Sequence, residues 1–335
     1  AARSSMEILS ELYGSPGRGS VAVAEIPSYR SEGVEATAYP GVVFVREHGG
    51  WTGDFEELDP DRPRYLARRV AHELAHQWWG DRLNPARTEP GAPVLTEAVA
   101  EWSAALVVRR TRGEAAFRSL MRREEERFLR YRGRAGPEVP LAATTGATDY
   151  LAYFKGPVVL NAVAELAGEQ AVVAALRELL ERTGERPATA GDLVRALSER
   201  VAAERRPLLE AWFRGTGTVD LQVGEASVRR LTDGRWEVTA DVTMDPREAD
   251  EDAEWAVGTG REPVPVEIWG GAAGGASAGD GVLARETLEL RPGRQTVRLV
   301  VAAPPARIEL DPTVTRLDPN RENNATDLTG PGGPR

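Results

Sequence analysis

The chain has 335 residues, of which 41% are hydrophobic and 28% are charged, and its formal net charge is −10. That length can bury a full core and predicts two domains, while the acidic balance argues against a nucleic-acid partner because no basic stripe is present to neutralise phosphates. No run of about twenty apolar residues predicts a transmembrane segment in this chain. The absence of cysteine removes disulfides, thiolate ligands and cysteine nucleophiles together.

The first part of the chain predicts one short helix and two strands. Residues 5–13 are amphipathic and are followed by Gly14, as a short helix would be. Residues 21–26 and 42–46 are rich in β-branched residues and are bounded by turn residues, which is typical of strands. A polar loop at residues 49–61 then leads into the next predicted helix.

That helix carries a pattern typical of metal sites. Pro63 suits its first turn, and Gly80 suits the stop after its last turn. Within it, His72 and His76 form an HExxH pattern, and residues four apart lie on one helix face, so both imidazoles can point at one ion. Glu73 lies about a hundred degrees around the helix from His72, where it can reach a metal-bound water without displacing a ligand.

The alternative interpretation is that these histidines are ordinary core residues that form hydrogen bonds within the fold. The chain has only three histidines, namely His48, His72 and His76. Random placement would give two of the three this spacing on the order of once in a hundred cases, before Glu73 is required. The pattern therefore favours a metal site.

A series of helices is predicted after a loop rich in proline and polar residues at 81–94. The first has Thr96 as its N-cap and runs to Gly113. The second, at 114–132, contains a run of Arg and Glu residues that is typical of a solvated face. Further helices are predicted at about 149–167, 169–183, 190–204 and 207–214.

A zinc site of this type needs a third protein ligand and one open position for water. Glu97 is the candidate, because it lies near the start of a helix that follows a loop long enough to turn the chain back. The alternative is a first-turn glutamate that complements the helix dipole. Glu101 lies one turn further along the same face, and it is either a group that orients a ligand histidine or a plain surface glutamate.

From Val219 the pattern changes from helical to alternating, which predicts a small β-sandwich. Residues 270–281 are almost all Gly, Ala and Ser and are predicted to form a mobile loop. The predicted organisation is a mostly helical domain at 1–217 with a small N-terminal strand region, a sandwich at 218–322 and a flexible tail at 323–335. The strand candidates are residues 236–243, 264–269, 288–290, 297–301 and 307–310.

Residues 72–81 together with 95–102 resemble the zinc aminopeptidase family typified by aminopeptidase N, a gluzincin. That family follows HExxH with a Trp and a Gly and places its ligand glutamate in a Leu-Asn-Glu-Gly-Phe-Ala-like helix. The equivalent here reads Leu-Thr-Glu-Ala-Val-Ala. The separation between the second histidine and Glu97 is slightly longer than is usual in the family, which an insertion in the 84–93 loop would absorb.

The resemblance also requires a Tyr-x-Lys-Gly segment further along the chain. It is present at 153–156 and contains Lys155, the only lysine of the sequence. In the family this tyrosine donates a hydrogen bond to the oxyanion, and the resemblance carries that role to Tyr153. Without the resemblance, Tyr150 and Tyr153 would be interpreted as core aromatics on one helix face. The implied fold class is α+β, with a thermolysin-like catalytic domain followed by the sandwich.

The activity that the resemblance implies is zinc-dependent hydrolysis of peptides, with removal of N-terminal residues. One zinc ion per chain would be held by His72, His76 and Glu97, and it would lower the pKa of its bound water. Glu73 would take the proton as this water attacks a peptide carbonyl and would then deliver it to the leaving amine. Zinc and Tyr153 would stabilise the oxyanion.

The sequence departs from the family pattern upstream of the metal site. The family carries Gly-x-Met-Glu-Asn before Pro-Gly, and its glutamate binds the free α-amino group of the substrate. Alignment on Pro40 and Gly41 places Ala38 at that position, and a methyl group cannot pair an ammonium. Glu35 is the carboxylate nearest in sequence. The alternatives are therefore an endopeptidase of relaxed specificity and a non-catalytic zinc-holding binding module.

A second departure concerns domain content. Members of the family normally begin with a large β-domain that covers the cleft, and nothing before residue 1 supplies it. We therefore expect either a piece of a longer parent protein or an unusually open cleft. Family habit and the cysteine-free composition favour a bacterial cell-envelope or secreted location, and they leave the cytoplasm open.

Overall fold

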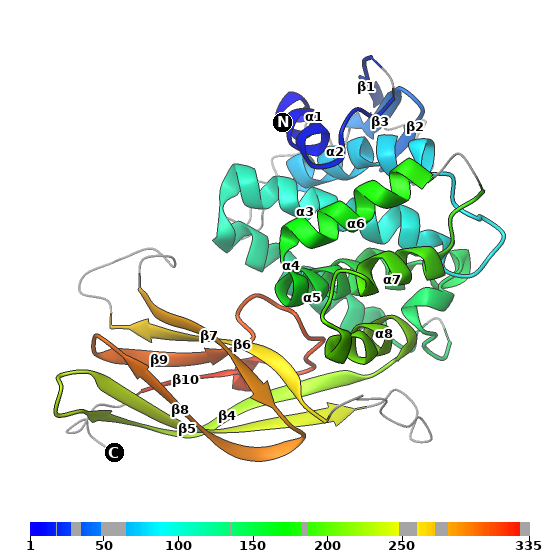
Figure 1. Cartoon of the computed structure of the whole chain (residues 1–335). Helices are drawn as coiled ribbons and strands as arrows, with labels where there is room; N and C mark the ends of the chain where they lie inside the picture. Colours follow the sequence, from blue (N-terminus) through cyan, green and yellow to red (C-terminus); the bar gives the residue numbers. More distant parts are fainter. Residues whose placement is uncertain are drawn as a thin grey trace. The chain divides into compact units, whose positions relative to one another are not determined.

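The computed structural model describes residues 1–17, 19–27, 35–47, 65–134, 136–182, 186–247, 260–271 and 281–328. The chain divides into two compact units, Ala1–Arg214 and Gly215–Arg335 (Figure 1). Helices dominate the first unit and strands the second, which confirms the predicted α+β class. His48, the 49–61 loop and Pro63 lie outside the described residues.

The first unit combines a small sheet with a set of packed helices (Figure 1). Its helices are α1 (Ala2–Tyr13), α2 (Tyr65–Ala75), α3 (Val99–Arg112), α4 (Glu114–Tyr131), α5 (Gly156–Ala167), α6 (Glu169–Glu181), α7 (Ala190–Ser198) and α8 (Arg206–Arg214). Its strands are β1 (Ala22–Ile26), β2 (Ala36–Tyr39) and β3 (Val42–Arg46). Strand β3 lies in the middle of this sheet, parallel to β1 and antiparallel to β2.

Three π-helical segments interrupt the regular helices, namely η3 (Gln77–Arg82), η4 (Val94–Ala98) and η7 (Leu151–Lys155). Segment η4 runs directly into α3, and η7 runs directly into α5. The predicted N-cap role of Thr96 is therefore wrong, because this residue lies inside η4 and its hydroxyl donates to the carbonyl of Pro93 at 3.4 Å. Such wide turns are frequent at functional sites.

Helix α2 is shorter than the sequence pattern predicts. It ends at Ala75, and the chain bends away within η3, where Trp79 and Gly80 have non-helical backbone angles. Gly80 has a φ of 126°, which a residue with a side chain rarely adopts. Its predicted role as the stop of a continuous helix is corrected to that of the bend residue in the following turn.

Helix α4 matches its predicted range but not its predicted exposure. Phe117, Leu120 and Phe128 form a buried face, as an amphipathic helix requires. However, Glu124 and Glu125 are each only 1% exposed, so part of the charged run is not a solvated face. Among the described residues no single helix has the length and apolarity to cross a membrane, and Leu151–Ala167 (η7 with α5) passes that test only together with α6, as a pair bent by 116°.

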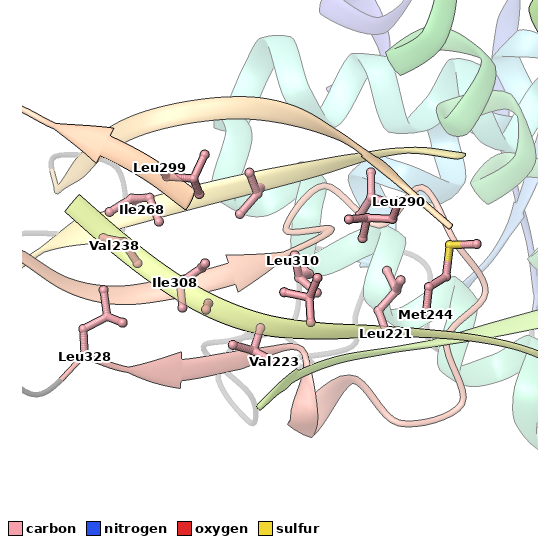
Figure 2. Packing of buried hydrophobic residues seen from close by; sticks show 14 of the residues in the cluster. Leu221, Val223, Val238, Met244, Ile268, Leu290, Leu299, Ile308, Leu310 and Leu328 are labelled. Atoms are coloured by element: carbon pink, nitrogen blue, oxygen red, sulfur yellow. The ribbon is translucent and has the colours of Figure 1, made fainter. Parts of the chain in front are cut away.

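The second unit is a sandwich of two antiparallel sheets. Its strands are β4 (Thr218–Arg230), β5 (Trp236–Arg247), β6 (Glu262–Gly270), β7 (Val282–Leu290), β8 (Gly293–Val301), β9 (Pro305–Leu310) and β10 (Ala325–Asp327). One sheet has the order β4-β5-β8 and the other β10-β9-β6-β7. Alternate residues of both sheets, among them Val238, Ile268 and Leu310, meet in one apolar core (Figure 2).

The predicted flexible tail is wrong as far as Leu328. Strand β10 pairs with β9 in antiparallel register, and Leu328 is 8% exposed and belongs to the sandwich core. The apolar contact and the ladder of backbone hydrogen bonds therefore fix this segment. Residues 329–335 lie outside the described part of the chain, as do residues 272–280 of the predicted mobile loop.

Candidate metal centre

Three side chains from two neighbouring segments of the first unit converge on one point. His72 lies in the last turn of α2, His76 directly follows that helix, and Glu97 lies in η4. The two Nε2 atoms are 3.1 Å apart, and they lie 3.4 and 3.3 Å from Oε2 of Glu97. Zinc–ligand bonds of 2.0–2.1 Å in tetrahedral geometry place ligand atoms about 3.3 Å apart. The three donors therefore fit a zinc ion, and they are the one such group found among the described residues.

The electrostatics of the group favour an anionic carboxylate at this point. Burial alone would raise the pKa of Glu97, but the hydrogen bonds and charges of His72 and His76 outweigh it and hold this pKa well below its ordinary value. Burial would lower the pKa of His76, and the adjoining Glu97 carboxylate outweighs that effect and raises it to about 9. A charged oxygen beside two imidazole nitrogens is a donor set suited to a divalent cation.

The second nitrogen of each histidine has its own neighbour. The Nδ1–H of His76 donates to the carbonyl of Trp79 at 3.0 Å, and Nδ1 of His72 lies 3.3 Å from the carboxylate of Glu101. Such contacts orient each ring and leave Nε2 directed at the shared point. Glu101 is 5% exposed, so the alternative of a plain surface glutamate is wrong.

A buried chain of charges continues from Glu101 to the neighbouring helix. Arg68 of α2 donates to Glu101 and lies 3.0 Å from Oε1 of Glu124 in α4. All three side chains are less than a tenth exposed. Sequence reasoning missed Arg68 and Glu124. The available signal was that Arg68 precedes His72 by four residues and therefore shares its helix face.

The turn that follows His76 is fixed by a buried hydroxyl. Oγ of Ser103 in α3 donates to the carbonyl of Val99 at 2.6 Å, accepts the indole N–H of Trp79 at 3.2 Å and lies 2.9 Å from the hydroxyl of Tyr13. Tyr13 also packs edge-on against Trp79, with ring centroids 4.9 Å apart. Helix α1 therefore helps to hold the carbonyl that orients His76.

Glu73 and Tyr153, the two predicted reacting side chains, lie beside the metal ligands. Glu73 is 7% exposed, and burial raises its pKa despite the neighbouring histidines. The ring centroid of Tyr153 lies 6.0 Å from that of His72. Burial raises the pKa of Tyr153 far above its ordinary value, and the Glu97 carboxylate, which accepts its hydrogen bond, adds to this effect. The hydroxyl is therefore a protonated donor at neutral pH.

The remaining residues of the Tyr-x-Lys-Gly segment explain how Tyr153 reaches the site. Lys155 is 2% exposed, and its ammonium is held 2.8 Å from the carboxylate of Glu138. A Cβ on Gly156 would lie 2.3 Å from Cβ of Ala98, the residue that follows Glu97. Glycine at the start of α5 thus permits a close approach to η4, which brings Tyr153 of the preceding η7 to Glu97.

The hairpin that carries Ala38 is tied to the same turn. Gln77 donates to the carbonyl of Tyr39 at 3.1 Å and accepts the N–H of Gly41 at 2.8 Å. Ala38 itself pairs with Val43 in the β2–β3 ladder and offers no charged group. Glu35, the nearest carboxylate in sequence, forms an ion pair with Arg69 of α2.

A cavity of about 350 Å³ opens directly beside the three-ligand group. Glu97 and Tyr153 form part of its wall. The loop between the two ligand segments contributes Arg87 and Glu89, and the segment before η7 contributes Asp149. The guanidinium of Arg87 donates to the carbonyl of Gly80 at 3.2 Å. The cavity gives the candidate site a wall that the sequence motifs did not predict.

An HExxH helix, a ligand glutamate from the next helical segment and an adjacent tyrosine define the class of gluzincin-type zinc metallopeptidases. The model of the peptidase family M1 domain matches residues 21–212, and the chain belongs to that family. This confirms the family expected from the sequence motifs, and zinc is the metal that the family implies. Comparison with curated protein sequences gives no significant match.

A solved structure of an aminopeptidase shares the fold with this chain at low sequence identity. Aminopeptidase A from Legionella pneumophila, solved in complex with aspartic acid, is 14% identical with a TM-score of 0.57, over 94% of this chain and 33% of that one. The M1 zinc metallopeptidase from Deinococcus radiodurans is 22% identical with a TM-score of 0.49, over 63% of this chain and 43% of that one. The chain thus spans less than half the length of either.

Proposed function

We propose that this protein hydrolyses peptides in a zinc-dependent reaction and removes residues from their N-termini. The observation that carries the proposal is the triangle of His72, His76 and Glu97 donors, with edges of 3.1 to 3.4 Å, in a chain of family M1. Glu73 and Tyr153 complete the set, because they supply a base and a hydrogen-bond donor beside that triangle.

The mechanism assigns a separate task to each side chain. His72, His76 and Glu97 would hold a zinc ion, which would supply Lewis acidity to a water molecule and to the substrate carbonyl. Glu73 accepts the proton of the attacking water and returns it to the leaving amine, and its burial keeps it a stronger base than an exposed glutamate. The Tyr153 hydroxyl donates a hydrogen bond to the carbonyl oxygen as negative charge develops there.

Removal of N-terminal residues requires recognition of a free α-ammonium group. Ala38 cannot supply it, and the Glu35 carboxylate already pairs with Arg69. The second candidate function, an endopeptidase, is favoured by this one observation. Both functions use the same zinc ligands and the same base.

The distinguishing experiment uses one set of peptides, each supplied with a free and with an acetylated N-terminus. Products are identified by mass spectrometry, with and without a zinc chelator. We expect chelator-sensitive trimming of the free peptides alone. Cleavage of both forms would establish the endopeptidase instead. A zinc-loaded protein that cleaves neither form would contradict a peptidase function and support the binding module.

A matched pair of variants tests the assigned roles. Glu73→Gln should retain zinc but lose at least about 10³-fold in turnover, because it removes the base and keeps the side-chain shape. His76→Ala should lose zinc as well as activity, because it removes a ligand. Zinc content is measured by atomic emission beside turnover. Equal zinc retention by both variants would contradict the assignment.

A further inference from the structure

We propose that Asp149 binds a cationic group of the substrate within the cavity beside Glu97 and Tyr153. The inference deepens the proposed function and rests on it. It names the residue that recognises the substrate, whether the substrate is bound by its free N-terminus or by a basic side chain. The cation is either an α-ammonium group or a basic side chain. Both present the same chemistry to a carboxylate, and the experiment below separates them.

Asp149 lies one turn before the tyrosine of the candidate site. Its backbone carbonyl accepts the N–H of Tyr153 at 3.1 Å, so the two residues are spaced along one side of the same turn. The carboxylate of Asp149 also acts electrostatically on the hydroxyl of Tyr153. Asp149 is an exposed residue at the edge of the cavity; partial burial and then the charge of Glu97 raise its pKa, and its own charge adds to the rise at Tyr153. A cation held by Asp149 is therefore next to the reacting groups.

The cavity that Asp149 lines is closer in size to a single amino-acid side chain than to an extended peptide. Its volume of about 350 Å³ lies at the small end of the range for ligand sites. Pro85, Pro90 and Pro93 provide rigid apolar wall, against which the methylenes of a side chain can pack. Apolar walls with a charged group at one place are the arrangement that binds an amphipathic cation.

The charge balance of the cavity also favours a positive ligand. A zinc ion bound by Glu97 would offset that carboxylate, which leaves Asp149 and Glu89 as the acidic groups of the described lining. Arg87 is the basic group of that lining, and it donates to the Gly80 carbonyl. Asp149 is the better candidate of the two acids, because its charge interacts with both Glu97 and Tyr153.

The inference also accounts for the missing carboxylate at Ala38. Strand β2 carries no acidic residue, and the carboxylate nearest to it in sequence, Glu35, is paired with Arg69. A site that prefers free N-termini still needs a group that attracts a cation. The described cavity provides such an acid on the segment before Tyr153, and not on the β2–β3 hairpin.

The experiment measures binding, so that it does not depend on turnover. The zinc-loaded protein is titrated calorimetrically at about pH 6.5, where α-ammonium and guanidinium groups are charged. Four probes are used, namely leucinamide, argininamide and the N-acetylated form of each. Asp149→Asn is compared with the wild type and with Glu89→Gln. Glu204→Gln, which changes an exposed glutamate outside the cavity lining, serves as the control for net charge.

We expect Asp149→Asn to weaken binding of the cationic probes by about 3- to 10-fold, as for a partly exposed ion pair, and to leave the acetylated leucine probe unchanged. If the wild type prefers leucinamide over its acetylated form, the α-ammonium is the bound group. If it prefers acetylated argininamide over acetylated leucinamide, the basic side chain is bound. In either case Asp149→Asn should remove the preference and Glu204→Gln should not.

Three results would overturn the inference. They are a wild type that does not distinguish the probes, an Asp149→Asn variant that keeps the full preference, and loss of the preference in Glu89→Gln alone. Failure of the proposed function gives a different result. In that case the peptides remain uncut although Asp149→Asn still changes the affinity for the cationic probes.

Discussion

The absence of a side chain at Gly156 helps to position Tyr153, the candidate reacting tyrosine. A Cβ at this residue would lie 2.3 Å from Cβ and 3.2 Å from Cα of Ala98, which are distances that force backbone movement. We expect Gly156→Ala to move η7 away from η4, to lower turnover at least about tenfold, and to cost about 1–3 kcal/mol of folding free energy. Peptide turnover and urea unfolding measure the two effects.

Gly191 provides the matched control. It lies within helix α7, and its added Cβ would meet Oγ1 of Thr189 at an ordinary 3.6 Å. Because alanine is a better helix former than glycine, Gly191→Ala should be neutral or stabilising by up to about 1 kcal/mol. Normal turnover in both variants would show that contact between η7 and η4 does not position Tyr153.

Ser103 is a second residue whose effect reaches the site through its neighbours. Ser103→Ala leaves the indole N–H of Trp79 and the hydroxyl of Tyr13 without this partner. Each unsatisfied buried group costs about 1–3 kcal/mol, so we expect the free energy of unfolding to fall by about 2–4 kcal/mol. Zinc affinity, measured by competition with a chromophoric chelator, should fall as well, because the Trp79 carbonyl orients His76.

The control for this change is a hydroxyl with no hydrogen bond of its own. Oγ of Ser198 is buried and has no such partner among the described residues. Ser198→Ala should therefore change stability by less than about 0.5 kcal/mol. Equal losses in the two variants would mean that the hydrogen bonds of Ser103 do not matter.

These residues mark the limit of what local sequence can predict about the site. The spacing of His72 and His76 is a property of one helix, and for that reason it could be found without a structure. The spacing of Arg68 from His72 places both on one helix face, but its contacts with Glu101 and Glu124 depend on segments that fold against it, as does the place of Asp149 in the cavity wall. The candidate metal ligands could be selected from sequence spacing and motif, whereas the contacts of the groups behind and beside them could not.

At the level of elements, the π-helical segments account for the errors in the predicted end of α2 and in the predicted starts of α3 and α5. Periodicity detects a repeat of 3.6 residues, and one wide turn changes that repeat too little to be visible in sequence. Thus η7 was contained in the predicted helix at 149–167, and η4 overlapped the predicted start of the helix that follows Thr96. Strand β2 was missed for a different reason. Its four residues are too few for an alternating pattern, and it is defined by its pairing with β3.

Helix α7 shows an element whose start is fixed by polar side chains. Thr189 and Asp192 form a reciprocal capping box, and Arg186 donates to both oxygens of Asp192. The Arg186 guanidinium, with Thr189 and Arg195 adding to it, holds the pKa of Asp192 below its ordinary value of 3.8. A carboxyl whose pKa is lower in the folded state stabilises the fold above that ordinary value, and its contribution is lost as the pH falls through the folded value.

We therefore expect a pH-dependent effect of Asp192→Asn. The variant should be less stable than the wild type at neutral pH, and the difference should shrink progressively as the pH falls below 3.8. Urea unfolding at about pH 7, 5, 4 and 3 measures this difference. These values span the range in which a free aspartate titrates, at about pH 4. A difference that stays constant over this range would show that the charge of Asp192 does not stabilise α7.

At the scale of the whole molecule, the change of period near Val219 separates two kinds of core. The first unit packs helices around the candidate metal centre, whereas the second encloses an apolar core between two sheets (Figure 2). Periodicity reports burial averaged over many residues, so a change of core type near Val219 is visible in the sequence. It could not predict that the last strand, β10, returns to pair with β9, because that pairing depends on contacts between distant residues.

The division predicts that a defect in the sandwich core will not change the metal site. Leu310 is fully buried in that core, so Leu310→Ala should cost about 2–5 kcal/mol in the stability of the second unit. Zinc binding should remain at one ion per chain with unchanged affinity, because all three candidate ligands lie within Ala1–Arg214. Val300→Ala on β8, a site that is 38% exposed, is the control and should cost less than about 0.5 kcal/mol. Should Leu310→Ala lose zinc while the helical unit stays folded by circular dichroism, the site would depend on the sandwich, and the ligand set derived from the first unit would be incomplete.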